Sequence, residues 1–283
     1  MCDDGGGDTG DNTGDNADNT SGGVSGDDII DTVPFEPCND CPEIDQDGDT
    51  NDPCANIKAK TSNNAYKQKF KDLNKPEKFN LNHESGFYER NVSGVNEYVD
   101  GVPNSDHTLS VPSDAQNATH VHNNIPLVYD GTTISYDAAI KMLSAGDILT
   151  LIKTCQSNNG NAQETFVTMI SNDGIFAIQL INPINFTSEI RNKIGELHKY
   201  FKSRSKFISD NYNDLTSNER KKYLEKMFLQ GLKDKNLDLD IALYEGEIEN
   251  ETDPDINNYN IKWKRKNLKK VFLGYNVVET PCK

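Results

Sequence analysis

The stretch "ETFVTMISNDGIFAIQLINP" (residues 164–183) is the clearest indication in the sequence of how the chain folds. Two runs rich in β-branched and aromatic residues flank the polar segment Ser171-Asn172-Asp173-Gly174. That arrangement is typical of a hairpin, because polar residues followed by Gly turn the chain between two strands. We therefore predict two adjacent antiparallel strands here, and the flanking sequence decides what packs against them.

Helical periodicity is strongest downstream, in residues 187–236, where two segments place apolar residues at i, i+3, i+4 and i+7. Thr216 or Ser217 begins the second segment, with Glu219 in its first turn. Upstream, residues 145–155 predict an apolar helix. Residues 55–75 predict one or two further helices that end at Pro76.

The other segments have the composition of strands. They are residues 84–91, 96–102 and 117–124 in the first half and residues 239–247, 259–267 and 269–279 in the second half. The order is helix, strands, helix, hairpin, helices, strands. It predicts an α+β (mixed α/β) domain with a mostly antiparallel sheet flanked by helices.

Charge divides the chain into two parts. Residues 1–57 contain 16 acidic residues and no Lys or Arg, whereas residues 58–283 contain 29 of each sign. The first part is also rich in Gly, Asp, Asn and Thr, so we predict a disordered acidic spacer with a Cys cluster followed by one folded domain over 58–283. A formally neutral domain does not indicate a nucleic-acid surface.

The sequence has six cysteines, and the first of them, Cys2, stands at the head of the acidic spacer. Cys2, followed by acidic residues and a Gly/Asp-rich spacer, resembles the mature start of a bacterial lipoprotein of the Bacteroidetes group. That resemblance implies an extracytoplasmic protein held by lipid at the outer membrane or cell surface. We also expect one or two disulfides, and a bond between Cys54 and Cys282 would tie the C-terminus to the start of the domain.

The acidic run from Asp45 to Asp52 alternates Asp with other residues around a Gly, as calcium loops do. It lacks the bidentate Glu that closes such a loop. We favour an acidic linker and keep calcium binding as the alternative.

Two of the five histidines, His120 and His122, stand one residue apart in "NATHVHNN". Side chains of a strand alternate between its faces, so both imidazoles point to one side while Val121 faces the core. Two imidazoles on one face can share a metal ion, which then needs a further ligand such as a carboxylate. Asp147 at the start of a helix and Glu84 before the first strands are candidates, and Glu89 is an alternative to Glu84.

Glu84-x-Gly86-Phe87, His120-x-His122 and Ser144-x-x-Asp147 before an apolar helix form a series that resembles the signature of the JAB/MPN (JAMM) metalloproteases. The resemblance covers the element order of roughly residues 66–283 and extends to uncharacterised Bacteroidetes proteins with a JAMM-like core. It implies that His120, His122 and Asp147 bind Zn²⁺. It further implies that Glu84 is the general base, that Ser144 hydrogen-bonds the oxyanion, and that a peptide or isopeptide amide of a peptide or protein substrate is hydrolysed.

The sequence departs from that signature at two points. Asn123 stands where the family has Pro, and 21 residues separate His122 from Ser144, where the family commonly has a short connection. The added segment could form a flap over the site. Ser144 and Asp147 also fit an ordinary helix capping box, and the same fold could serve as a non-catalytic surface-exposed binding module.

Two further motifs have structural interpretations. Cys155 falls on an apolar helix, so we do not expect a nucleophile there. The basic run from Lys262 to Lys270 is typical of a solvated strand face.

Overall fold

The computed structural model describes residues 54–104, 108–123, 127–129, 133–135, 141–211, 215–272 and 274–282. The predictions for the acidic spacer, for lipid attachment at Cys2 and for calcium at residues 45–52 lie outside the described residues. The first helix begins at Ala55, so the folded part starts slightly before residue 58.

The described residues form six α-helices and an eight-stranded sheet. The predicted α+β class with a mostly antiparallel sheet is thus confirmed. The helices are α1 (Ala55–Thr61), α2 (Asn64–Leu73), α3 (Pro76–Phe79), α4 (Ala145–Ser157), α5 (Ser188–Asn211) and α6 (Ser217–Asp234). The strands of the large sheet are β1 (Gly86–Val92), β2 (Val95–Asp100), β5 (Asn117–Val121), β8 (Phe166–Ser171), β9 (Gly174–Leu180), β10 (Ile241–Glu249), β11 (Asn260–Val271) and β12 (Gly274–Pro281). Two small pairs accompany them, β3 (Val102–Pro103) with β4 (Leu109–Ser110) and β6 (Leu127–Tyr129) with β7 (Thr133–Ser135).

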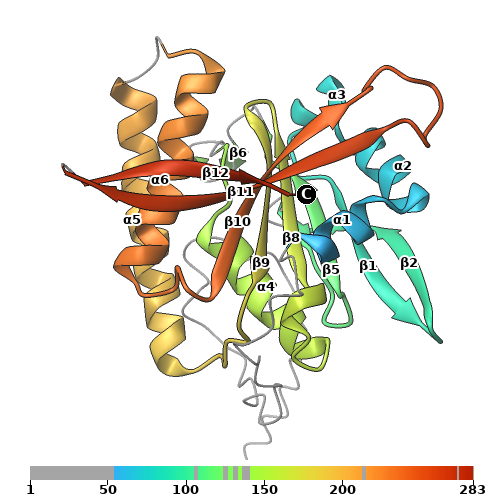
Figure 1. Cartoon of the computed structure of the whole chain (residues 1–283), viewed down its shortest axis with the longest axis horizontal. Helices are drawn as coiled ribbons and strands as arrows, with labels where there is room; N and C mark the ends of the chain where they lie inside the picture. Colours follow the sequence, from blue (N-terminus) through green and yellow to red (C-terminus); the bar gives the residue numbers. More distant parts are fainter. Residues whose placement is uncertain are drawn as a thin grey trace, which may run out of the picture.

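The strand order in the large sheet is β12-β11-β10-β9-β8-β5-β1-β2. Every neighbouring pair is antiparallel except β5 and β8, which are parallel and are joined by a connection that contains α4. Figure 1 shows α5 and α6 on one side of the sheet and α1, α2 and α3 on the other. The sheet is therefore the middle of three layers.

Each face of the sheet has its own hydrophobic core because strand side chains alternate. One core joins α4, α5 and α6 to the sheet through residues such as Ile148, Phe228 and Ile178. The other joins α1 and α2 to the opposite face through Tyr66, Phe70 and Trp263, among others. Along β5, Ala118 belongs to the first core and Val121 to the second, so the prediction that Val121 faces a core is confirmed.

The hairpin in residues 164–183 is confirmed as β8 and β9, which pair from Phe166 with Gln179 to Ser171 with Gly174. Thr216 is the N-cap of α6, with Glu219 completing a capping box.

Two expectations about element boundaries were wrong. Residues 269–279 are not one strand, because the chain turns between Val271 and Gly274 to form the β11–β12 hairpin. Pro76 also does not simply end a helix. It occupies the first turn of α3, where its missing N–H costs nothing.

A disulfide joins Cys54 to Cys282, with the two Cα atoms 5.5 Å apart. Cys54 directly precedes α1, and Cys282 follows β12, so the bond closes the folded domain at its two ends. The predicted pairing is thus present. Among the described residues, no helix has both the length and the apolar character needed to cross a membrane.

Candidate metal centre

The centre lies where β1, β5 and the start of α4 meet. Gly86 of β1 pairs with His120 of β5. A Cβ atom on Gly86 would lie 2.3 Å from the Thr119 carbonyl oxygen, so only glycine permits this approach of the two backbones. Because Glu84 precedes Gly86 by two residues, the tight pairing brings its carboxylate next to the β5 histidines.

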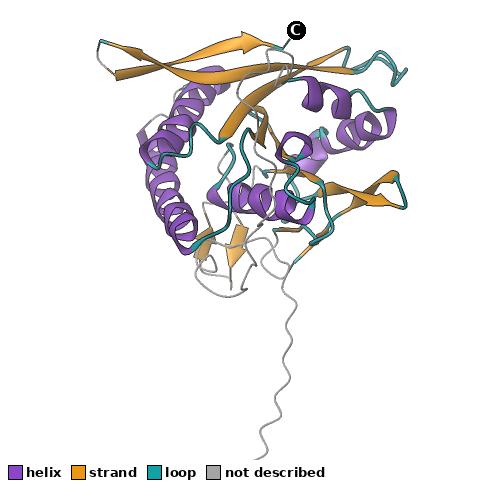
Figure 2. Cartoon of the chain, turned by 60° about the horizontal axis from the view of Figure 1, so that its bottom comes forward, coloured by secondary structure: helices purple, strands orange, loops and turns teal. Residues whose placement is uncertain are grey.

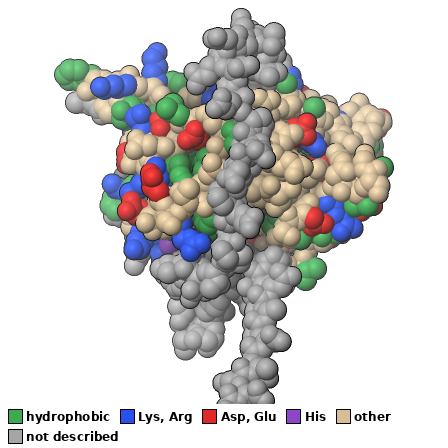
Figure 3. Space-filling view, turned by 90° about the horizontal axis from the view of Figure 1, so that it is seen from below, with side chains coloured by type: hydrophobic (Ala, Val, Ile, Leu, Met, Phe, Trp, Pro, Cys, Tyr) green, Lys and Arg blue, Asp and Glu red, His purple; other side chains and the backbone are tan. Residues whose placement is uncertain are grey.

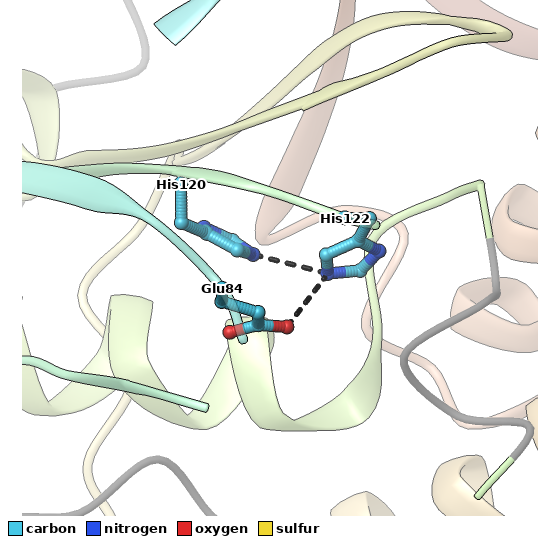
Figure 4. Close-up of side chains that lie close together, drawn as sticks. All are labelled: Glu84, His120 and His122. Carbon is cyan, nitrogen blue, oxygen red and sulfur yellow. Dashed lines mark hydrogen bonds and ion pairs between the residues drawn. The ribbon is translucent and has the colours of Figure 1, made fainter. Parts of the chain in front are cut away.

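His120 and His122 direct their rings toward each other from the end of β5 (Figure 4). Their Nε2 atoms are 3.1 Å apart and both side chains are buried. The ring of His120 also hydrogen-bonds the backbone of Thr168 on β8, and the backbone N–H of His122 donates to the carbonyl of Ile170 at 2.9 Å. Strand β8 therefore fixes both histidines.

Asp147, in the first turn of α4, supplies a buried carboxylate to the same cluster. Its Oδ1 lies 3.1 Å from His120 Nε2, and its Oδ2 lies 3.9 Å from His122 Nε2. Oδ2 also accepts hydrogen bonds from the backbone N–H of Ser144 at 2.6 Å and from its hydroxyl at 2.9 Å. The predicted capping box is present, and it holds the aspartate in place beside His120.

Glu84 approaches from the other side. Its Oε1 lies 3.8 Å from His122 Nε2, and its Oε2 accepts a hydrogen bond of 3.0 Å from the backbone N–H of Leu109 on β4. Figure 4 shows the carboxylate below the two imidazoles.

Glu89, the alternative to Glu84, lies elsewhere. It forms an ion pair of 2.7 Å with Lys60 of α1 and accepts a hydrogen bond from the Asn117 side chain at 2.9 Å. Those contacts place it among residues of the α1 side of the sheet. The structure therefore separates the two carboxylates that the sequence could not.

Electrostatics at the centre favour a charged His120–Asp147 pair when no metal is bound. Burial alone would lower the pKa of His120, but the charge and hydrogen bond of Asp147, with a contribution from Glu84, raise it to about 9. Burial opposes ionisation of Asp147 as well, yet the neighbouring histidines hold its pKa below the ordinary value. The site thus concentrates negative charge around two imidazoles.

Glu84, His120 and His122 each place one ligand atom within 4.8 Å of the others and could together hold a metal ion. Asp147 adds a carboxylate at comparable distance, so two carboxylates and two imidazoles converge. All four sequence-predicted groups, with Ser144 behind Asp147, come together. Buried imidazole and carboxylate groups in such a cluster are the donors that Zn²⁺ and other divalent transition metals prefer.

Asn123, which stands where the JAMM signature has Pro, is a further residue of the centre. It is fully buried, and its Nδ2 donates to the carbonyl oxygens of Leu81 and His83, the latter at 2.7 Å. The backbone carbonyl of Asn123 accepts a hydrogen bond from Lys141 Nζ. One asparagine thereby connects the segment before Glu84, the segment of His122 and the segment before Ser144.

The Lys141 contact also closes the base of the inserted segment, since residues 124–140 lie between the two partners. Within that segment the backbone forms the small β6–β7 pair. Asn123 and Lys141, which border the insertion, therefore lie in contact, and His122 and Asp147 lie close together in spite of it.

Cys155 is a free, buried thiol on α4, and burial raises its pKa to about 11. It is therefore protonated at neutral pH and is not a nucleophile there, in agreement with the sequence analysis.

Comparison of the chain with protein-family models, with curated proteins and with solved structures gave no match.

Proposed function

We propose that the protein is a zinc-dependent hydrolase of peptide or isopeptide amide bonds. The observation that carries the proposal is the 3.1 Å separation of the Nε2 atoms of His120 and His122, with Asp147 Oδ1 also 3.1 Å from His120 Nε2. Residues chosen because their order resembles the JAMM signature converge on one buried cluster, which supports the resemblance.

The donor set fits zinc. With Zn–N distances near 2.0–2.1 Å, two ligand atoms of a tetrahedral site lie roughly 3.3 Å apart. The two imidazole nitrogens and the nearer aspartate oxygen are close to that separation. Asp147 is the better third ligand because its oxygen is nearer to an imidazole nitrogen than that of Glu84, which lies 3.8 Å away. The Thr168 backbone would fix the ring of His120, as ligating histidines generally require.

Zinc bound by His120, His122 and Asp147 would lower the pKa of a water molecule and polarise the substrate carbonyl. The chain's own residues would then handle the protons. Glu84 Oε1, held by the Leu109 N–H on its other oxygen, would take a proton from that water and deliver it to the leaving amine. Burial of all four side chains keeps bulk water away and strengthens each electrostatic interaction.

Ser144 has two roles in this proposal, to position Asp147 and to stabilise the oxyanion. Its hydroxyl donates to Asp147 and accepts from the Asp147 backbone N–H at 3.3 Å. In that arrangement it positions the aspartate. Stabilising an oxyanion would require the hydroxyl to turn from the carboxylate to the substrate.

The test is metal content together with hydrolysis. The purified protein, loaded with zinc and dialysed, should retain one zinc per chain by plasma mass spectrometry, and His120→Ala should lose it. His83→Ala is the matched control, because the exposed His83 side chain hydrogen-bonds that of its neighbour Asn82 and the substitution leaves the His83 backbone carbonyl in place. Cleavage of a peptide library should depend on that zinc.

Failure to retain zinc, with melting unchanged by a chelator, would remove the metal site altogether. Stoichiometric zinc without cleavage of peptides or isopeptide-linked conjugates would instead support the alternative function, a binding module that keeps the site.

A further inference from the structure

The β11–β12 hairpin extends beyond the helices that cover the sheet. Strand β11 has 12 residues and pairs with β12 from Lys264 with Pro281 to Val271 with Gly274. Figures 1 and 2 show its turn projecting past α5 and α6. We call Lys269, Lys270, Val271 and Phe272 the hairpin end.

The basic run of β11 divides into two parts with different partners. Nearer the body, Lys266 contacts Glu245 at 2.5 Å and Glu279 at 3.1 Å, and Lys264 contacts Glu247 at 2.6 Å. Lys269 and Lys270, by contrast, are exposed and form no ion pair with any residue in the described part of the chain. Their cross-strand partners are Asn276 and Tyr275, which are uncharged.

The apolar side chains of the hairpin end are exposed beside these lysines. Phe272 is 100% exposed and Val271 is 36% exposed. Residues 269–278 contain no acidic residue. Figure 3 shows hydrophobic side chains at the tip of the projection and Lys or Arg side chains next to them. A large aromatic side chain that is fully in water at a projecting turn loses the free energy that burial would supply.

We propose that the hairpin end docks on an anionic phospholipid surface, with Phe272 inserted among the lipids and Lys269 and Lys270 in contact with the headgroups. Two observations and one general property of lysine favour a lipid surface over a folded partner. The apolar part is a narrow tip and not a flat patch, its flanking charges are all positive, and long lysine side chains can remain hydrated while their stems lie against the lipid.

The net charge of −16 is not carried by the domain that holds the hairpin end. All of the excess negative charge lies in residues 1–57, and the remainder of the chain is formally neutral. The positive field of the hairpin end is therefore not cancelled by the domain that carries it. The inference is independent of the proposed hydrolase activity.

Phe272→Trp offers a direct measurement, because the chain has a single tryptophan, Trp263, and it is buried. With phosphatidylcholine vesicles that contain phosphatidylserine, the new tryptophan should shift to shorter wavelength and be quenched by brominated lipid. With phosphatidylcholine alone the change should be small. The wild-type protein, whose tryptophan is in the core, should show neither effect.

Vesicle sedimentation of the full chain gives the affinity. Lys269→Glu together with Lys270→Glu should weaken binding by more than tenfold, since each lysine near an anionic surface contributes about a fivefold effect. Phe272→Ser should weaken it by about tenfold or more. Leu239→Ser is the matched control, because Leu239 is similarly exposed but lies in the α6–β10 connection.

Equal binding of Phe272→Ser and wild type, or an unquenched Phe272→Trp signal, would overturn the proposal. So would self-association in analytical ultracentrifugation that Phe272→Ser abolishes without vesicles, because the occupant would then be a second copy. Circular dichroism of each variant excludes misfolding as the cause.

Discussion

Asp147 and His120 lie with Oδ1 and Nε2 3.1 Å apart, while the other oxygen of the same carboxylate completes the capping box with Ser144. The helix-cap and metal-ligand interpretations are therefore compatible, since the two oxygens face different partners. The cap fixes the rotamer of the aspartate, and the start of α4 then presents Oδ1 to His120, while Oδ2 also lies 3.9 Å from His122 Nε2. The hydrogen bonds of the helix cap in this way position the Asp147 carboxylate beside His120.

The two roles of Asp147 can be separated by substitution. Ser144→Ala removes one capping interaction and should lower the free energy of unfolding by about 1 kcal/mol while zinc is retained. Asp147→Asn keeps the size of the side chain but removes its charge, and it should abolish stoichiometric zinc. Chemical denaturation and metal analysis of both variants check this, and equal zinc loss in the two would show that the cap alone governs binding.

Glu84→Gln should keep zinc and reduce hydrolysis by about 10²–10⁴-fold, because an amide cannot accept the proton of the attacking water. Glu89→Gln is the matched control. It weakens the ion pair with Lys60, so the melting temperature should fall while activity per folded molecule is maintained. Steady-state kinetics with a cleaved library peptide provide the measurement, and a retained rate in Glu84→Gln would assign the base elsewhere.

Asn123→Ala removes two hydrogen bonds from the segment before Glu84. It leaves the carbonyls of Leu81 and His83 without this donor, so we expect a loss of about 1–3 kcal/mol in stability. We also expect a lower kcat with zinc still bound. The substitution loosens the segment that positions Glu84, whereas β8 continues to hold the two histidines. Asn80→Ala is a suitable control, as that exposed side chain bonds Pro76 within α3. An unchanged kcat would show that Asn123 contributes to stability only.

Zinc binding at pH 7 should release a proton from His120. Burial lowers the pKa of His120, but Asp147 raises it to about 9, so the metal-free protein is protonated there, whereas zinc needs the neutral imidazole. Calorimetric titration in buffers of different ionisation enthalpy measures the release.

The same pKa shift predicts how the stability of the metal-free protein depends on pH. A folded pKa of about 9 against 6.5 for free histidine stabilises the fold fully below pH 6.5, and this contribution is lost as the pH rises through 9. Thermal melts of chelator-treated protein from pH 6 to pH 9.5 should therefore fall more steeply for wild type than for His120→Ala, and parallel curves would contradict the shift.

The disulfide between Cys54 and Cys282 spans 228 residues of sequence. Closing so long a loop restricts the unfolded chain, so replacing both cysteines by Ser should reduce stability by about 2–5 kcal/mol. Denaturation with and without reductant checks this. If reductant still lowers the stability of the double Ser variant, a second disulfide must contribute. Cys155, the remaining cysteine among the described residues, is a free thiol in the structure.

The class of fold was predictable because its signals are local. The turn between Ser171 and Gly174, the helical periods of α5 and α6 and the cap at Thr216 each act within a few residues. The β11–β12 turn was missed because Val271 and Phe272 continue the strand-like composition up to Gly274, and only the pairing of β12 back onto β11 shows where the strand ends.

The sequence allowed the residue types of the candidate site to be predicted, but not how these residues are arranged in space. Glu84 and Glu89 have equal chemistry in sequence, and they are separated only because Gly86 allows β1 to meet β5 at His120. The role of Asn123 depends on contacts with residues about 40 positions away, which no local pattern encodes.

The disulfide between Cys54 and Cys282 holds the two ends of the folded domain next to each other, with their Cα atoms 5.5 Å apart. A short linker between them, in place of the disulfide, would preserve α1 and β12 where they are. New termini could then be opened at the exposed β1–β2 turn, where Ser93 and Gly94 have φ values of 54° and 86°. Such a circular permutant should fold to the same sheet, because this architecture depends on which strands meet and not on where the polypeptide begins.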